Sequence, residues 1–451
     1  MTGQLRSLAS TGVVLVTAFF LAGCESAGLS APSMPSIPGV SSLFGEKEAP
    51  PLPGERVSVL STSSTNSASS VEVKGPVILP APRNNASWSQ PGGVPSNSPG
   101  HLSFSGTGRK VWRERAGAGS NSDGRITAIP IVYNGKVFTL DREGLVTAFS
   151  AGSGSKLWRL SLQPEDEKAE GGFGGGLAID NGRLYAATGF GTVTAINISS
   201  GKALWTKKLG VPVRASPTAV NGKVFVVNSE SQLFALSGAD GKELWRGRGL
   251  PEAASMLTNA SPAVIGNTLV VAYSSGEIAA FDIKTGQQRW IDSVSGGLIG
   301  SSMSSVGDTA RPVIDRNIVF ASSQSGRIIA TALKSGDRVW SRDIRSDQSL
   351  CVAGETVFAV DITGKLYALT RKTGKVRWVA TLPDARIWNG PTLAGGKLWL
   401  VSNKGILVGV DARSGQISTK SDLEYATYIP PVVAGGRMFV LTDKARLIAI
   451  N

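Results

Sequence analysis

The sequence holds one histidine and two cysteines in 451 residues, and its body shows no sustained apolar period of about 3.6 residues. His101 alone cannot build a cluster of imidazole ligands, so the composition excludes a histidine-rich metal site and histidine-based catalysis. The chain also lacks a Gly-x-Ser-x-Gly elbow and a phosphate-binding loop that ends in Lys-Ser or Lys-Thr. The missing helical period predicts almost no helix in the body of the chain.

Instead, one phrase recurs along most of the chain and is clearest at residues 280–290, AFDIKTGQQRW. It consists of a small residue, an apolar residue, a turn that usually reads Thr-Gly or Ser-Gly, and a tryptophan four residues after the glycine. Copies that keep the tryptophan end at Trp158, Trp205, Trp245, Trp290, Trp340 and Trp378. Their spacing of about 40 to 50 residues is typical of four-stranded propeller blades.

Between the copies, short runs rich in valine, isoleucine and phenylalanine alternate with Asn-Gly and Ser-Gly turns, a pattern typical of strands in hairpins. The turn glycine permits a positive φ. The tryptophan is expected to dock over the next blade while its indole N–H meets a backbone carbonyl. This structural role is favoured over ligand stacking for all six tryptophans.

The small-residue half of the phrase occurs eight times, and the two ends of the chain carry complementary halves. A copy at residues 409–419 has lost its tryptophan, residues 108–112 hold only the second half, and residues 449–451 hold only the first. Pairing the N-terminal strand with the last blade would close the ring and remove a free sheet edge. The sequence therefore predicts an all-β, eight-bladed β-propeller of four-stranded antiparallel blades over residues 86–451.

Residues 1–23 predict a lipoprotein signal peptide, because a positive Arg6 precedes a short apolar run at 13–21 and Leu-Ala-Gly precedes Cys24. This order resembles a bacterial lipobox, in which the cysteine is lipidated; the alternative is an ordinary secretory signal with an incidental cysteine. By resemblance to enterobacterial lipoproteins, Glu25 in place of aspartate favours the outer membrane. With Cys24 lipidated, Cys351 has no disulfide partner and is expected to be a small buried residue.

Residues 24–85 are rich in serine, proline and alanine, which predicts a lipid-anchored, disordered tether. The chain has a net charge of +13, and the tether is nearly charge-balanced, so the propeller carries most of the positive charge. A basic surface favours acidic partners or anionic lipid headgroups, and general solubility explains it equally well. The export signal excludes nucleic acid as a partner.

The repeat resembles that of quinoprotein alcohol and glucose dehydrogenases, which bind pyrroloquinoline quinone in an eight-bladed propeller. That resemblance implies a catalytic aspartate, a Ca²⁺ site, basic contacts to the quinone and often a cysteine pair. The sequence has no cysteine pair, no long pocket-forming insertion and no acidic cluster typical of a Ca²⁺ loop. We therefore expect no cofactor, no metal and no catalytic residue, with a quinone-dependent dehydrogenase as the alternative.

The lipobox, the repeated phrase and the lack of cofactor ligands together resemble the BamB family, lipoprotein subunits of the β-barrel assembly machinery in Gram-negative bacteria. The resemblance covers roughly residues 88–451. It implies a non-catalytic scaffold at the outer membrane that faces the periplasm and binds the POTRA domains of the central barrel subunit. It also implies a role in delivering or positioning unfolded outer-membrane proteins. A further alternative is a binding propeller of another envelope complex.

Two connections, 251–260 and 293–311, are longer than the usual hairpin loop. They place apolar residues where polar ones are expected, at Met256, Leu257, Leu298, Ile299 and Met303. Exposed apolar groups in loops indicate a partner surface. The alternative is that they fill the mouth of the central channel.

The family resemblance implies contact through a Leu-x-Leu-Arg loop and through an acidic loop before a Thr-x-Pro strand start. Met256 and Leu257 match the apolar part of the first loop, although Thr258 stands where arginine is expected. Asp308 matches the acidic position of the second loop, with one extra residue before Pro312. The predicted partner-binding residues are therefore Met256, Leu257, Leu298, Met303 and Asp308.

Overall fold

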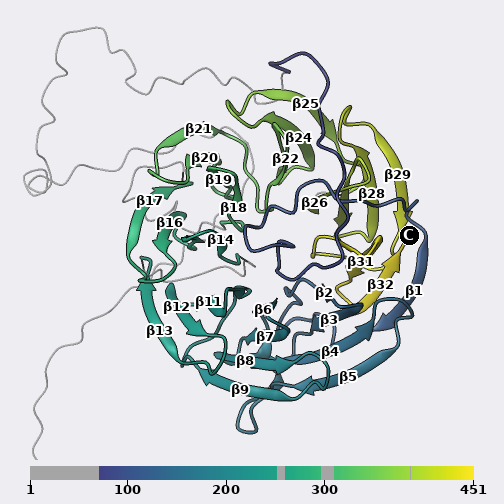
Figure 1. Cartoon of the computed structure of the whole chain (residues 1–451). Helices are drawn as coiled ribbons and strands as arrows, with labels where there is room; N and C mark the ends of the chain where they lie inside the picture. Colours follow the sequence, from purple (N-terminus) through teal and green to yellow (C-terminus); the bar gives the residue numbers. More distant parts are fainter. Residues whose placement is uncertain (1–70, 251–259, 296–308, 386) are drawn as a thin grey trace, which may run out of the picture. The chain divides into compact units, whose positions relative to one another are not determined.

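The computed structural model describes residues 71–250, 260–295, 309–385 and 387–451. In this part of the chain, the strands form eight four-stranded antiparallel sheets, arranged as blades around a ring (Figure 1). The only helix among the described residues is one short 3₁₀ turn, η1 (Ala169–Gly172). The predicted eight-bladed β-propeller is therefore confirmed.

Within each blade the strands pair in order, from an innermost strand at the ring centre to an outermost strand at the rim (Figure 1). The first four blades in chain order are β2 (Ile131–Tyr133), β3 (Lys136–Leu140), β4 (Leu145–Ser150), β5 (Lys156–Ser161); β6 (Gly176–Asp180), β7 (Arg183–Thr188), β8 (Thr192–Asn197), β9 (Ala203–Lys208); β10 (Thr218–Val220), β11 (Lys223–Val227), β12 (Gln232–Ser237), β13 (Glu243–Arg248); and β14 (Ala263–Ile265), β15 (Thr268–Ala272), β16 (Glu277–Asp282), β17 (Gln288–Ser293). The other four are β18 (Val313–Asp315), β19 (Ile318–Ala321), β20 (Ile328–Ala332), β21 (Arg338–Arg342); β22 (Cys351–Ala353), β23 (Thr356–Val360), β24 (Lys365–Thr370), β25 (Val376–Thr381); β26 (Trp388–Ala394), β27 (Lys397–Ser402), β28 (Ile406–Asp411), β29 (Ile417–Asp422); and β30 (Val432–Ala434), β31 (Arg437–Leu441), β32 (Arg446–Ile450), β1 (Lys110–Arg115).

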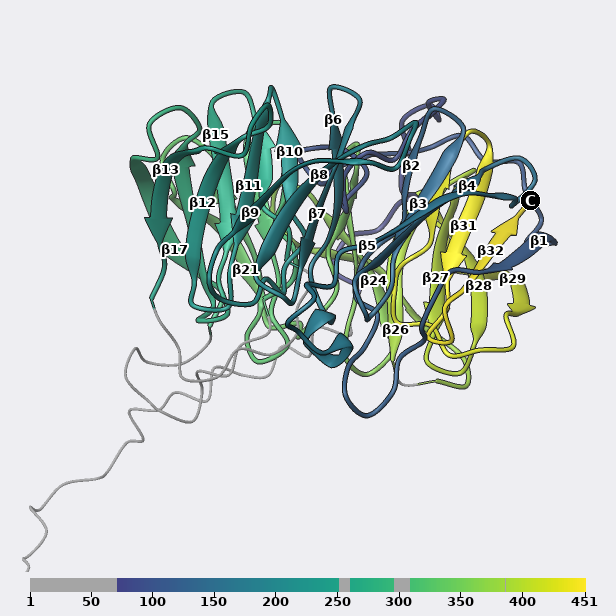
Figure 2. The ribbon, with the colours of Figure 1, turned by 90° about the horizontal axis from the view of Figure 1, so that it is seen from below.

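The ring has two faces, which are distinguished by the chain segments they carry (Figure 2). The hairpin face carries the turns between the first and second strands of the blades, such as residues 134–135. On the opposite connection face, the chain passes from the fourth strand of one blade to the first strand of the next. The hydrophobic core lies between blades, because the buried clusters draw residues from neighbouring sheets.

The ring closes where an N-terminal strand meets the end of the chain. β1 pairs antiparallel with β32, which places Trp112 opposite Ala449 and Arg115 opposite Arg446. The eighth blade therefore takes three strands from the C-terminus and its outermost strand from the N-terminal part. This is the closure predicted from the two half copies of the phrase, and it is confirmed.

Each repeated tryptophan lies on the outermost strand of its blade and covers the turn glycine of the next blade. An added Cβ at Gly201, for example, would lie 2.6 Å from Trp158 Cδ2. The tryptophan–glycine pairs are Trp112–Gly154, Trp158–Gly201, Trp205–Gly241, Trp245–Gly286, Trp290–Gly336, Trp340–Gly374 and Trp378–Gly415. In six of these pairs the indole N–H also donates to a backbone carbonyl of the next blade, at 2.8–3.3 Å. The predicted docking is confirmed, although the Trp378 indole N–H has no such partner among the described residues.

The small residue of the phrase lies between two large side chains of its own blade. Ala368 pairs with Phe358 on one side and with Trp378 on the other, and the two ring centroids are only 5.9 Å apart. A larger side chain between them would separate the rings. In the copy without tryptophan, the large ring is instead Trp399 on the second strand, and glycine replaces alanine at Gly409.

The glycine–tryptophan contact gives a testable difference between two glycines of similar conformation. Gly374→Ala is expected to destabilise the propeller by about 2 to 4 kcal/mol, because alanine must adopt a positive φ and its Cβ would lie 2.7 Å from Trp340 Cε3. Gly222→Ala is the control, because its φ is +72° against +66° and no atom lies within 4 Å of the added Cβ. Its loss should be about 1 kcal/mol. Urea denaturation measures both, and equal losses would contradict the docking.

Residues 85–102 form a segment that crosses the ring centre and bonds to the innermost strands; it is named the plug segment here (Figure 1). Its carbonyl groups accept N–H bonds at 2.7–2.9 Å from Val132, Ile179, Val264 and Ile314, each in a different blade. The first strand of a blade has an open edge towards the ring centre. These bonds therefore satisfy backbone groups that would otherwise need water.

Gln90 is the most deeply buried polar side chain of the plug segment, with 1% of its surface exposed. Its Nε2 donates to Ile179 O at 2.9 Å and to Ala219 O at 2.7 Å, while Oε1 accepts from Ala219 N at 3.0 Å. One side chain thereby joins the innermost strands of two neighbouring blades, β6 and β10.

The structure differs from the prediction that residues up to 85 belong to a disordered tether, because residues from Glu72 onward contact the propeller. The Glu72 N–H donates to Val376 O at 2.8 Å, and its carboxylate pairs with Arg342 at 3.0 Å. Val77 is 1% exposed and packs into the core cluster of the sixth and seventh blades. The composition of this segment is typical of a loop, yet the segment contains a buried side chain, Val77, and a carboxylate in an ion pair, Glu72.

The tether prediction for residues 24–70 lies outside the described residues, as does the signal peptide at 1–23. Both stay predictions. Within the described ranges, no helix has the length and apolar character needed to cross a membrane.

Candidate functional site

All residues predicted to be lipidated or to bind a partner lie outside the described residues, namely Cys24, Met256, Leu257, Leu298, Met303 and Asp308. Their roles stay predictions. The structure does place the residues that flank the two predicted loops: Leu250 is 61% exposed, whereas Ala260 and Ala310 are 7% and 4% exposed. Ala260 and Ala310, which follow the undescribed parts of the two connections, line a central cavity.

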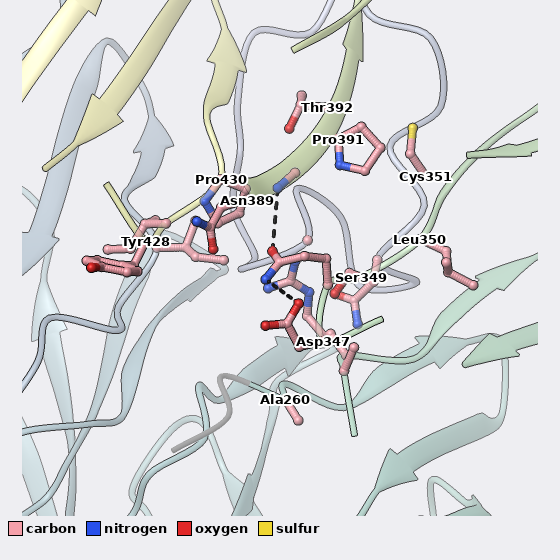
Figure 3. A pocket seen from close by; sticks show the side chains of 18 of the residues that line it. Ala260, Asp347, Ser349, Leu350, Cys351, Asn389, Pro391, Thr392, Tyr428 and Pro430 are labelled. Carbon is pink, nitrogen blue, oxygen red and sulfur yellow. Dashed lines mark hydrogen bonds between the residues drawn. The ribbon is translucent and has the colours of Figure 1, made fainter. Parts of the chain in front are cut away.

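A cavity of about 640 Å³ lies inside the ring (Figure 3). Four residues of the plug segment, Trp88, Gly92, Asn97 and Pro99, form its floor on the hairpin side. Its walls are made by residues at or just before the innermost strands, such as Leu350 and Ile429. The cavity therefore exists because the innermost strands are short and the plug segment closes one end of the channel.

Among the described residues, two guanidinium groups and one carboxyl group line this cavity. Arg311 is half-buried in the wall, and burial lowers its pKa to about 10. Burial raises the pKa of Asp347, whose Oδ1 accepts a bond from Gln348 Nε2 at 3.1 Å (Figure 3). Arg125 stacks over the Tyr428 ring at 4.7 Å from its centroid. The described lining of the cavity is therefore positive on balance.

The single histidine and the second cysteine have structural surroundings. His101 is 5% exposed; its Nδ1 lies 2.7 Å from Pro80 O, and its Nε2 accepts from Gly396 N at 2.9 Å. Nε2 thus joins the N-terminal segment to the seventh blade, whereas Nδ1 contacts another residue of the N-terminal segment itself. Cys351 is buried, as expected, and burial raises the pKa of its thiol to about 12, which disfavours the reactive thiolate.

The sequence reasoning did not single out Arg311, Asp347 or the plug residues. Arg311 stands in the Pro-bearing stretch before an innermost strand, and the corresponding stretches of other blades line the cavity as well. The stretch before the innermost strand of each repeat is therefore the place in the sequence where residues that line the channel can be found. None of the six repeated tryptophans is among the described residues that line the cavity, in agreement with their docking role.

The chain is similar to proteins of one family along most of the propeller. A family profile described as outer membrane protein assembly factor BamB matches residues 103–165, 142–380 and 381–451. BamB of Moranella endobia (strain PCIT) is 24% identical over 352 residues, which are 76% of this chain and 90% of that protein. BamB of Escherichia coli (strain K12) is 26% identical over 364 residues, 71% and 83% of the two chains. The match to BamB of Legionella pneumophila (strain Paris), 26% identical over 190 residues, spans 42% of this chain and 50% of that protein.

Solved structures show the same fold in proteins of different kinds. BamB from Moraxella catarrhalis has a TM-score of 0.63 at 19% identity, covering 76% of this chain and 98% of that chain. The quinohemoprotein alcohol dehydrogenase ADHIIG from Pseudomonas putida HK5 has a TM-score of 0.66 at 13% identity, covering 81% and 80%. At these identities, the structural similarities establish the propeller fold and nothing more. The family profile, in contrast, matches the sequence from residue 103 to residue 451. By that match, the chain belongs to the family of outer membrane protein assembly factor BamB.

Proposed function

We propose that this chain is a non-catalytic scaffold subunit of the outer-membrane β-barrel assembly machinery. Lipid at Cys24 anchors it in the outer membrane, with the propeller facing the periplasm. The propeller binds the POTRA domains of the central barrel subunit and aids the insertion of outer-membrane proteins. The observation that carries the proposal is the family match along residues 103–451. The names of the relatives, outer membrane protein assembly factor, supply the process.

The chain's own features support this role. The lipobox-like sequence before Cys24 fits a membrane-anchored subunit, and residues 24–70 are predicted to be the tether. In the sequence, the two long connections precede β14 and β18, which are the innermost strands of the fourth and fifth blades.

Isolation of the lipidated protein from native membranes tests the proposal as a whole. The barrel-forming subunit with its POTRA domains is expected to co-purify after mild detergent extraction. Co-purification of a different envelope complex, without that subunit, would contradict the proposal. It would show instead that the chain is a binding propeller of that other complex.

The predicted contact residues are tested by a triple variant, Met256→Asp, Leu257→Asp and Asp308→Lys. It is expected to lose at least about 90% of the co-purifying barrel subunit, because apolar contacts are replaced by charges and an acidic contact is inverted. A matched control changes three exposed residues elsewhere, Leu157→Asp, Leu204→Asp and Asp123→Lys. Unchanged co-purification by the first variant, or equal loss by the control, would refute the assignment of the loops.

The enzyme alternative has its own measurement. Within the described ranges, no group of three or more His, Cys, Asp or Glu side chains is placed to hold a metal ion. Dye-linked oxidation of alcohols or sugars, after addition of pyrroloquinoline quinone and Ca²⁺, would identify a dehydrogenase. We expect no turnover above that of the heat-denatured protein.

A further inference from the structure

The central cavity has the size, the lining and the charge of a site for a small organic anion. We propose that it binds an organic carboxylate with an apolar body, and that Arg311 pairs with the carboxylate group. This inference is independent of the proposed scaffold function, because it concerns the inside of the ring and needs no partner protein.

The size and the walls favour an organic ligand over an inorganic ion. A volume of about 640 Å³ lies within the range of about 300 to 1,000 Å³ that small-molecule sites span. Apolar side chains occupy much of the wall, at Ile126, Ile129, Leu350, Ile387, Pro391 and Ile429. A phosphate or chloride ion would leave this apolar surface uncovered, whereas an aromatic or aliphatic body would cover it.

Arg311 supplies the reason for a negative charge on the ligand. Its Nε is buried and has no hydrogen-bond partner among the described residues, and burial lowers its pKa. None of the ion pairs formed by the described residues includes this guanidinium. A partly desolvated cation without a counter-ion is costly, and a carboxylate can accept two parallel N–H bonds from an arginine.

Asp347, the acidic residue in the cavity lining, is not the counter-ion of Arg311. Asp347 is bonded to Gln348, and Gln348 Oε1 in turn lies 3.5 Å from Gly390 N (Figure 3). The carboxyl group is thus held towards the sixth and seventh blades. Arg125, stacked on Tyr428, adds a second positive group to the lining. The plug segment lines the cavity on the hairpin side.

The test compares two probes of nearly equal shape, 2-naphthoate and the neutral 2-naphthamide, on the full-length purified chain by isothermal titration calorimetry. Naphthoate is expected to bind about tenfold or more tightly than naphthamide, because the charge-assisted pair with Arg311 is lost in the amide. Arg311→Gln should abolish this preference. Arg248→Gln, which removes an exposed guanidinium on β13 outside the cavity, should leave it unchanged.

Two further variants keep the test decisive if Arg311→Gln folds poorly. Arg311→Lys retains the charge without the two-pronged geometry and should keep part of the preference. Ile387→Trp fills the cavity and should weaken both probes by a similar factor. Equal affinities of the two probes, an unchanged preference in Arg311→Gln, or no binding of naphthoate at millimolar concentration would each overturn the proposal.

Discussion

Replacing Trp340 by alanine is expected to destabilise the propeller by about 3 to 5 kcal/mol, as is usual for a large buried aromatic side chain. The indole is 8% exposed, its Nε1 donates to Arg371 O at 2.9 Å, and its ring lies against Gly374 of the next blade. It also packs against Phe320 of its own blade, with ring centroids 5.9 Å apart. The substitution therefore removes contacts within one blade and between two blades at once.

The neighbouring residue provides a matched control on the same strand. Val339 precedes Trp340 on β21 and is 44% exposed, so Val339→Ala should change stability by no more than about 0.5 kcal/mol. Urea denaturation followed by far-UV circular dichroism compares the two, since the signal does not depend on the removed indole. Similar small losses for both variants would show that the tryptophan is not an inter-blade contact.

Replacing Gln90 by alanine should cost about 2 to 4 kcal/mol, although the residue belongs to a segment without regular secondary structure. The loss of its side chain leaves two carbonyl groups and one N–H group on β6 and β10 without their bonds. These groups are buried and cannot recover the bonds from bulk water. Gln90→Glu keeps the acceptor and removes the donor, so most of the loss should persist.

Gln163 is the control for this second prediction. Its Nε2 also donates to a backbone carbonyl, Glu167 O at 2.8 Å, but this bond lies at the exposed surface. Gln163→Ala should therefore change the denaturation midpoint very little, because water replaces the lost bond. Equal effects of the two alanine substitutions would mean that the plug segment does not contribute to the stability of the ring.

The blades could be predicted from sequence because their contacts repeat at a fixed position. Seven turn glycines of the phrase each contact the tryptophan of the preceding blade, so the same physical contact recurs around most of the ring. In the copy that ends at Thr419, the tryptophan of the phrase is lost, and Trp399 on β27 supplies the large ring instead. Ring closure was predictable for the same reason, because β1 and β32 each hold half of the phrase.

The plug segment and the cavity could not be predicted in this way. Residues 85–102 are rich in asparagine, serine, proline and glycine, a composition typical of loops, and their partners are spread over the whole chain. Arg311 is unremarkable in sequence, and its burial results from the way that several blades converge on the axis. The contacts of the plug segment and of the cavity each occur only once, so no repeated pattern in the sequence indicates them.

The plug segment also determines when the ring can become stable during folding. Asn85 Nδ2 donates to Val433 O, which is 348 residues away, and β1 needs β32 as its partner. Contacts of such large sequence separation form late, because a long loop must be closed before they contribute. The closing strand β1 therefore stays unpaired until β32, from the other end of the propeller sequence, is available to it. Over that interval β1 and β32 each leave a strand edge without its partner, so the time before ring closure is the stage at which this propeller depends most on protection from aggregation.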